Sequence, residues 1–527
     1  MTNYPSPADA PSQHLQGSSA VKDQSGTLVR NLTSLTTANL IAHVVTGLVS
    51  VLVANHLGKT GYGEFRTALA FATVFLIFAE TGVGARFLYD RSGDKSQINE
   101  HYGSMIFLQA VPYMAVFAVT MAMAFVFRYS NVIIWLIAIV SMAAIFRVFG
   151  EVCERVLNVY QEIHLTAIMR SIRFFSIAVG GVGVLVFNLG PIGWGLINLV
   201  AMLISATATF LTTLKYARPR FVKSLFWPTL VASYPFGLGA ICYAIYENVD
   251  QVMLSKMMPV DLREETVGIY GAAYTVMMFT YVIPSSFIAS IEPIVFGARG
   301  DDHRLAHMGS LASRALGVIG LPLTLGTILL SGQIAALALP SFGPTAGKAL
   351  AALAPFCFFR FLNFPGGMLL AAAGMQKRRV IVQAGAVVFN IALNFVVIPY
   401  YGLFGAAWAT VATEIYIFIC YEVSLVRRLP GYGEFARLVK PFIAATVMGL
   451  FVAAALYALN SPAGRAWLGW MAIHHKKSLL DLSWLLIVPL AAALYFGLLK
   501  AMGFFTDEEM TFFGRVLDRF TFWRRRA

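Results

Sequence analysis

Two arginines stand inside apolar stretches of this sequence, and each follows a phenylalanine. Arg147 follows Phe146, and Arg360 follows Phe359 in a second stretch 213 residues later. A guanidinium is costly to place in the interior of a bilayer, so such an arginine normally faces a bundle interior or a watery cavity. The spacing predicts two copies of one architecture, each with an interior cation, as in transporters built from repeated halves.

A polar stripe accompanies Arg147 along its stretch. Glu151, Glu154 and Asn158 follow at i+4, i+7 and i+11, which places them on the same helical face as Arg147. An earlier apolar stretch has the same spacing in Asn39, His43, Thr46 and Ser50. Two interpretations stay open: the stripes line a wet central cavity, or an Arg147–Glu151 pair and interhelical hydrogen bonds hold the bundle together. For His43 we favour a hydrogen-bonded interior histidine over a proton relay.

Arg360 differs from Arg147 because no carboxylate lies one turn away. Its neighbours at i±3 and i±4 are Phe356, Cys357, Asn363 and Phe364. Arg360 therefore needs a partner from another helix, or an anionic ligand. Arg66, just inside another apolar stretch, either adds a cation to a cavity mouth or reaches the lipid headgroups.

Carboxylates inside apolar stretches are candidate sites for a coupling ion or a proton. They are Glu80, Glu151, Glu154, Glu247, Asp250 and Glu414. The alternative is structural, since a single carboxylate could serve only to neutralise Arg147 or Arg360.

The composition is that of a multi-pass membrane protein. Hydrophobic residues make up 58% of the 527 residues and charged residues 12%, with a mean hydropathy of +0.71, whereas soluble proteins carry about 25% charged residues. We predict an all-α polytopic fold with about 14 transmembrane helices, since each crossing needs about 20 apolar residues. The four cysteines lie in apolar stretches and have no metal or disulfide spacing.

The net charge of +13 is interpreted as a topology signal and excludes nucleic acid as the expected partner. Membrane proteins concentrate Lys and Arg in cytoplasmic loops, and an N-terminus inside the cell places most of the 39 Lys and Arg on that side. The same assignment places the C-terminus inside.

Three landmarks recur in the same order and divide the predicted spans into two parallel six-helix lobes around a central cavity. They are Arg147 with Arg360, Gly63 with Gly268, and the pair of glycines at 190 and 193 with those at 402 and 405. We predict a disordered cytoplasmic tail (1–29), an N-lobe (30–214), a linker (215–230), a C-lobe (231–428), two additional C-terminal spans (429–503) and an amphipathic cytoplasmic tail (504–527).

Catalytic motifs are missing from the sequence. It contains no HExxH, no GxxxxGK[ST], no GxSxG and no metal-spaced Cys/His set. The longest predicted outer loop, about 460–480, is short for a membrane-embedded enzyme of glycan assembly. We therefore expect neither an enzyme nor a bound cofactor.

Several segments together resemble the polysaccharide-biosynthesis flippases, the Wzx-type branch of the multidrug/oligosaccharidyl-lipid/polysaccharide exporter superfamily. The matching segments are LGKTGYG at 57–63, ETG at 80–82, ENVDQVML at 247–254, GIYGAAY at 268–274 and IPYYGLFGAA at 398–407, the last preceded by Asn390 and Asn394. The likeness extends from about 30 to 430, and it is carried by the order and spacing of these motifs.

The resemblance implies a flippase that moves a polyprenyl-diphosphate-linked glycan across a bacterial inner membrane by alternating access, for surface polysaccharides such as O-antigen or exopolysaccharide. Arg147 and Arg360, with Arg66, Asn39, His43 and Asn158, are then the expected cavity residues for the diphosphate and sugar. By analogy alone, a glycan polymerase and a chain-length regulator are expected partners. The alternatives are an ion-coupled multidrug exporter of the same superfamily and, with less support, a glycan-assembly enzyme.

Overall fold

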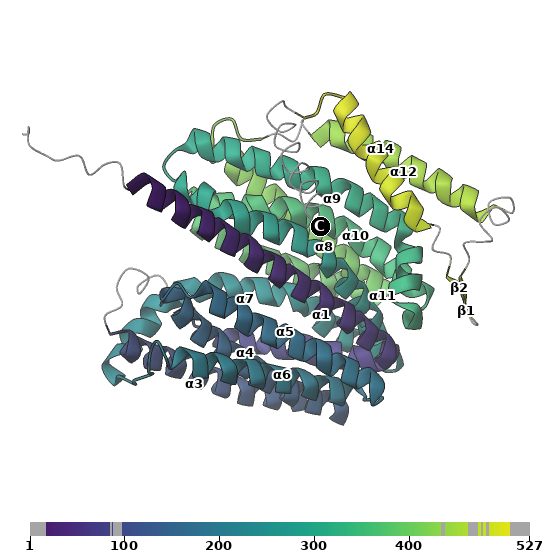
Figure 1. Cartoon of the computed structure of the whole chain (residues 1–527). Coiled ribbons are helices and arrows are strands. Elements are labelled where there is room, and N and C mark those ends of the chain that lie inside the picture. The colour runs from purple at the N-terminus through teal and green to yellow at the C-terminus, as the bar shows by residue number, and fades with distance from the viewer. Residues whose placement is uncertain are drawn as a thin grey trace, which may run out of the picture.

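The computed structural model describes residues 17–84, 87, 97–433, 438–461, 473–475, 478–480 and 484–505. Side chains are described from Val44 onward, with short gaps that include 234–240. The described chain is almost entirely helical (Figure 1). Of the two predicted tails, residues 1–16 and 506–527 lie outside the described residues, and the first helix begins at Gly17.

The helices follow one another with short connections, and we call α1–α6 the first half and α7–α11 the second half. The first half contains α1 (Gly17–Leu76), η1 (Ile77–Ala79), α3 (Ile98–Val126), α4 (Asn131–Val159), α5 (Ile163–Val186) and α6 (Pro191–Thr213). The second half contains α7 (Phe226–Met257), α8 (Arg263–Gly297), α9 (Asp302–Ala338), α10 (Pro344–Ala372) and α11 (Gln376–Arg428). Two helices follow, α12 (Val439–Asn460) and α14 (Trp484–Ala501), and three short 3-10 turns lie at η2 (Lys223–Leu225), η3 (Val260–Leu262) and η4 (Pro340–Phe342).

Local sequence explains where several helices begin. The Ser130 side chain caps α4 by accepting a hydrogen bond from the backbone N of Ile133 at 3.4 Å, and Asp301 caps α9 by accepting from the backbone N of Arg304 at 3.0 Å. Pro191 occupies the first position of α6, where its missing N–H has no cost. These capped starts follow short turns, so consecutive helices lie against each other.

Two helices are each long enough for two crossings. At 1.5 Å per residue, α1 with 60 residues and α11 with 53 residues measure about 90 and 80 Å, against about 30 Å of bilayer hydrocarbon. Each is interrupted by a glycine in the left-handed region, Gly58 (φ 68°) and Gly402 (φ 54°). In α11, Asn390 precedes Gly402 and Thr413 follows it, yet Asn390 donates a hydrogen bond to Thr413. The chain therefore reverses at Gly402. Each of these helices therefore contributes two of the predicted spans.

In the part of the chain that the structure describes, eleven helices are long and apolar enough to cross a membrane. With α1 and α11 each reversing, they cover thirteen of the fourteen predicted spans. The remaining one, the seventh, coincides with α7, which is not among the eleven and carries Glu247 and Asp250. The prediction of an all-α multi-pass membrane protein is confirmed. The described residues differ from an all-α structure in one short antiparallel pair of strands, β1 (Ile473–His475) and β2 (Ser478–Leu480), which lies in the predicted long outer loop.

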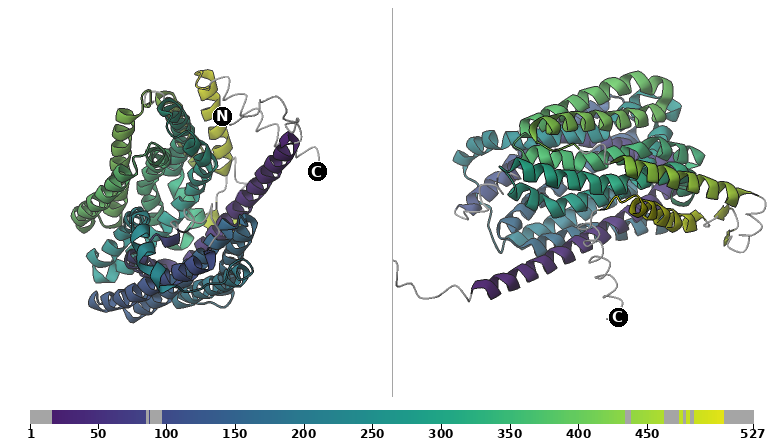
Figure 2. Two further views of the ribbon diagram at one scale, coloured as in Figure 1. Left: turned by 90° about the vertical axis from the view of Figure 1, so that its left-hand side faces the viewer. Right: turned by 90° about the horizontal axis from the view of Figure 1, so that it is seen from above.

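The helices of the two halves form neighbouring groups (Figures 1 and 2). In the first half α4 packs against α6, and α1 against α5 and α4; in the second half α10 packs against α9, α11 and α8. Helices α12 and α14 pack on each other and on α9, at the edge of the second group. The division into two lobes related by symmetry stays a prediction.

The two halves meet near the kink of α1, which we call the Gly58 end. Lys59 Nζ donates to Glu265 Oε1 at 2.8 Å, and Asn55 Nδ2 donates to the backbone oxygen of Ala338 at 2.6 Å. The hydroxyl groups of Tyr62 and Thr275 lie 3.0 Å apart. The largest apolar core of the described residues continues across this contact.

Gly63 and Gly268 bring the two backbones together at the Gly58 end. A Cβ on Gly63 would overlap the backbone oxygen of Glu264, and one on Gly268 would overlap that of Lys59. The same two Cβ positions lie 3.0 and 3.1 Å from the backbone N of the opposite glycine. The glycines that mark corresponding positions in the sequence repeat therefore lie against each other, and any side chain would force the helices apart.

Candidate functional site

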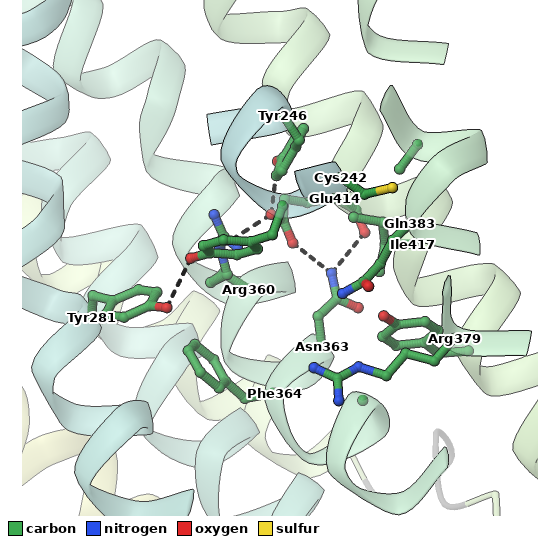
Figure 3. A pocket seen from close by; sticks show the side chains of 14 residues that line it. Cys242, Tyr246, Tyr281, Arg360, Asn363, Phe364, Arg379, Gln383, Glu414 and Ile417 are labelled. Carbon is green, nitrogen blue, oxygen red and sulfur yellow. Dashed lines mark hydrogen bonds and ion pairs between the residues drawn. The ribbon is translucent and has the colours of Figure 1, made fainter. Parts of the chain in front are cut away.

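Arg360 forms a buried ion-pair cluster with two carboxylates from other helices. It pairs with Glu247 of α7, and its Nε lies 3.1 Å from Glu414 Oε1 of α11. The side chains of Arg360, Glu247 and Glu414 are 8%, 14% and 1% exposed. We call these three residues the Arg360 cluster; Figure 3 shows Arg360 and Glu414 of this cluster. The sequence analysis inferred that Arg360 needs a partner from another helix or an anionic ligand, and two other helices each supply a carboxylate.

Tyrosine and asparagine side chains complete the hydrogen bonding of the two carboxylates. Tyr246 donates to Glu414 at 2.7 Å and Tyr274 donates to Glu247 at 2.6 Å. Asn363 Nδ2 donates to Glu414 Oε2 at 2.5 Å. A buried ion pair is stable only when its remaining polar atoms are satisfied, and here these donors supply most of that requirement.

An aromatic cage surrounds the guanidinium of Arg360. Its Cζ lies 4.8 to 5.8 Å from the ring centroids of Tyr243, Tyr246, Tyr281 and Phe356. Rings at this distance attract a cation through their quadrupole, an effect that strengthens when water is absent. The cage and the carboxylates together fix Arg360 in place.

Asp250, one turn beyond Glu247 on α7, is buried and bonded within the second half. Its carboxylate accepts hydrogen bonds from Tyr270 and from Thr410, the latter at 3.2 Å. The next residue, Gln251, accepts a hydrogen bond from Arg66 Nε of α1 at 2.9 Å. Arg66 therefore connects the halves, and its side chain points inward instead of reaching the headgroups.

Arg147 lies in a different environment. Its NH1 donates to Glu151 Oε1 at 2.7 Å within α4, and the two side chains are 43% and 39% exposed. Arg147 lines a cavity of about 340 Å³ whose wall also includes Arg66, Tyr113, Asn198 and side chains from α1, α6 and α8. Since Arg147 is near the middle of a membrane helix, this exposure places a solvent-accessible cation deep inside the bundle.

The rest of the polar stripe on α4 bonds to α5. Arg170 Nε donates to Glu154 Oε2 at 2.9 Å, and Thr166 donates to Asn158 Oδ1 at 3.0 Å. Of the stripe, only Arg147 lines the cavity described above. For Glu154 and Asn158 the interpretation as interhelical hydrogen bonds therefore describes the geometry better than the cavity interpretation.

The remaining predicted site residues fall in three places. Glu80 accepts hydrogen bonds from Gln109 Nε2 at 3.2 Å and from the backbone N of Gly82 at 3.1 Å. The structure brings Glu247 and Glu414 together at Arg360, and Asp250 is bonded beside them. The side chains of Asn39 and His43 lie outside the described residues.

The sequence analysis did not identify Asn363 or the tyrosines around Arg360 as site residues. Tyr243, Tyr246, Glu247 and Asp250 follow one another on α7 at i, i+3, i+4 and i+7, the spacing of one helical face. That pattern was available in the sequence and would have directed attention to this face. Asn363 stands one turn after Arg360 but offers no such pattern.

A pocket of about 110 Å³ adjoins the Arg360 cluster. Its wall includes Arg379 and Gln383 of α11, together with Asn363 and Tyr421 (Figure 3). Arg379 belongs to a run of basic residues that looked like an ordinary helix boundary in the sequence. Its place in the pocket wall depends on the packing of α11 over α10.

Solved structures of other membrane transporters share this fold. The chain superposes on the lipid II flippase MurJ in its inward closed conformation with a TM-score of 0.70, at 15% identity, over 89% of this chain and 98% of that one. It also superposes on an inward-facing multidrug resistance transporter of the MATE family with a TM-score of 0.59, at 15% identity, over 73% and 94%. The fold is that of the superfamily to which this MATE transporter belongs.

The family follows from the sequence comparison. A family model described as polysaccharide biosynthesis protein matches residues 28–296, about half of the chain, and a second model, MatE, matches residues 235–396. The chain therefore belongs to the polysaccharide biosynthesis protein family.

A curated relative supports the same class. The probable flippase AglR of Haloferax volcanii is 27% identical over 171 residues, which are 31% of this chain and 35% of that protein. The match thus spans about a third of the relative's length. Family and fold together place the chain in the multidrug/oligosaccharidyl-lipid/polysaccharide exporter superfamily.

Proposed function

We propose that the protein is a flippase that moves a polyprenyl-diphosphate-linked oligosaccharide across a bacterial inner membrane by alternating access. The observation that carries this proposal is Arg147, a cation exposed in a cavity near the middle of the membrane. Its guanidinium matches the paired oxygens of a diphosphate. The Glu151 partner is itself exposed, and such a pair has a small net free energy, so an anionic substrate can compete for Arg147.

Arg360 can bind a substrate anion only after it is released from its own carboxylate partners. Two carboxylates already neutralise it, so a substrate anion reaches it only when Glu247 or Glu414 releases it. Protonation of either carboxylate weakens its attraction for the guanidinium, which would couple proton binding to anion binding. Glu247, Glu414 and Asp250 are on this account the proposed coupling residues, ahead of Glu80, Glu151 and Glu154.

The contacts at the Gly58 end support a state closed on one side. We propose that this end faces outward, with both termini in the cytoplasm. The closed end would then open as the substrate is delivered to the outer leaflet. A glycan polymerase and a chain-length regulator remain proposed partners on family grounds.

A multidrug exporter of the same superfamily is the second candidate. One observation favours it: the second half places three carboxylates, Glu247, Asp250 and Glu414, at or beside Arg360, and Asp250 and Glu414 are buried. An acidic interior suits cationic substrates. The exposed Arg147 in the first half favours the flippase.

Native mass spectrometry of the purified full-length protein tests the proposal. The wild type is expected to carry a polyprenyl-diphosphate oligosaccharide, and Arg147→Gln is expected to lose most of it. Arg218→Gln, which removes an exposed arginine from a loop, is the control and keeps the lipid. A bound hydrophobic cation in place of the lipid contradicts the flippase, and unchanged lipid in Arg147→Gln contradicts the role of Arg147.

A further inference from the structure

The pocket beside the Arg360 cluster contains a second arginine, Arg379, in the first turn of α11. It packs against α10 at Gly367. A Cβ on Gly367 would lie 3.6 Å from Arg379 Nε and 3.5 Å from Tyr421 Cε2, which are ordinary van der Waals distances. The Arg379 and Tyr421 side chains therefore lie against α10 at this position.

Arg379 differs from Arg360 in its charge environment. Within the described ranges, no carboxylate lies within ion-pair distance of Arg379, whereas Arg360 has two. The guanidinium lines the pocket together with Tyr421, and its Nε is buried and has no hydrogen-bond partner. Glu414 also lines the pocket, where it pairs with Arg360 and not with Arg379. Arg379 is thus a cation with unused donor capacity.

Asn363 contributes an unused acceptor to the same pocket. Its Nδ2 is committed to Glu414, through both the carboxylate and the backbone oxygen, which fixes the orientation of the amide. Its Oδ1 is buried without a partner, in a residue only 8% exposed. A buried polar atom left without a bond costs about 1–3 kcal/mol. The pocket therefore presents one unsatisfied donor and one unsatisfied acceptor.

This pair of atoms defines the chemistry of a ligand. Arg379 suits a phosphate oxygen, and Asn363 Oδ1 suits a hydroxyl group that donates. The cavity of about 110 Å³ holds on the order of eight water-sized groups, at about 10–15 Å³ each. That room matches a phosphate with part of a sugar ring and is too small for a whole oligosaccharide.

The position of Arg379 suits a site of entry. It lies 23 residues before Gly402 along α11, about 35 Å at 1.5 Å per residue. Gly402 contacts Met258, whose backbone oxygen accepts from Arg263 beside the Glu265–Lys59 pair, so Arg379 is far from the closed Gly58 end. The N-terminus of a helix attracts anions, and the exposed Lys377 and Arg378 precede Arg379. An anion arriving from that side meets these cations first.

We propose that Arg379 and Asn363 form a binding site for a sugar phosphate group, in which Arg379 holds the phosphate and Asn363 the sugar hydroxyl. This inference rests on the proposed function and deepens it, since it identifies where the phosphate-linked sugar first binds. The same chemistry is offered by a free sugar phosphate and by a lipid-linked one.

Equilibrium binding to the full-length protein in amine-oxide micelles, which contain neither phosphate nor sugar, tests the site. The probes are radiolabelled glucose 1-phosphate, polyprenyl-phosphate glucose and free glucose. Arg379→Gln is expected to weaken binding of the phosphorylated probe at least tenfold, and Arg379→Lys to restore part of it. Lys377→Gln removes an exposed charge two residues earlier and is expected to change binding less than twofold.

Each outcome decides the proposal. Binding of glucose 1-phosphate indicates recognition of the head group alone, and binding of only the polyprenyl probe indicates a lipid source; both support the site if Arg379→Gln abolishes them. Three results overturn the proposal. They are equal binding by Arg379→Gln and Lys377→Gln, binding of free glucose as strong as that of glucose 1-phosphate, and no binding of either phosphorylated probe. The flippase proposal is judged separately, by the lipid that co-purifies with the wild type.

Discussion

The two interior arginines stand at positions that the predicted sequence repeat makes equivalent, yet they lie in different environments. Arg360 is enclosed by carboxylates from two other helices and by aromatic rings. Arg147 pairs with a residue of its own helix and faces a cavity. Position in a repeat therefore predicts where a cation lies, while the neighbouring helices decide whether it is available to a ligand.

The free energies of the two pairs explain this difference. Removing one partner of a buried pair leaves an uncompensated charge, whereas an exposed pair has little net stability because water solvates both partners. We interpret the Arg360 cluster as a structural unit that must be rearranged before it can act. Arg147 needs no such rearrangement.

The largest expected effect comes from Arg360→Gln. This change leaves Glu247 and Glu414 buried without their cation, and we expect a loss of about 3–5 kcal/mol in the free energy of unfolding. Arg147→Gln is expected to cost less than about 1 kcal/mol because its pair is exposed. Thermal unfolding of both variants in detergent measures the contrast.

The triple variant Arg360→Gln, Glu247→Gln, Glu414→Gln is the control for the Arg360 prediction. Removing both orphaned charges is expected to recover most of the lost stability. The comparison breaks down if the two single arginine variants unfold at the same temperature, or if the triple variant is less stable than Arg360→Gln.

A smaller effect is expected from Glu151→Gln, which releases Arg147 from its carboxylate. An exposed pair is worth up to about 1 kcal/mol, so a soluble prenyl diphosphate is expected to bind up to about fivefold more tightly. Titration of the purified variant with farnesyl diphosphate measures this change. Weaker binding would show that Glu151 positions Arg147 and does not compete with the ligand.

A local effect on stability is expected from Arg66→Gln. Arg66 lines the Arg147 cavity and donates to Gln251 of the second half, so this change removes one hydrogen bond between the halves. A loss of about 0.5–1.5 kcal/mol in stability at the Gly58 end is expected. Hydrogen exchange of 55–66 and 263–275 reports it, and an effect spread equally over α12 and α14 would contradict the assignment.

The sequence predicted the fold well because membrane helices have a strong local signal. Length and apolar composition placed the helices. Arg147 and Arg360 were also found locally, because an arginine in an apolar helix is rare. The partners of Arg360 could not be found that way, since Glu247 and Glu414 lie 113 residues before it and 54 residues after it.

The polar stripe on α4 shows the limit of helical spacing. Spacing placed Arg147, Glu154 and Asn158 on one face, but at 1.5 Å per residue Glu154 and Asn158 lie about 10 and 16 Å further along the helix, so one face can contact a cavity at one level and a helix at another. Glu154 and Asn158 bond to α5, while Arg147 lines the cavity. Only the packing of α5 distinguishes these residues. Arg379 was missed for the same reason.

The contact of Gly63 with Gly268 has a consequence for leakage across an energised membrane. A barrier made of side chains opens transiently whenever a rotamer changes, on a picosecond to nanosecond timescale. Here backbone lies on backbone, so no rotamer change can admit a chain of water molecules at that point. The barrier opens only when whole helices move, over microseconds to milliseconds. Two residues without side chains thus make this contact both tight and slow to open.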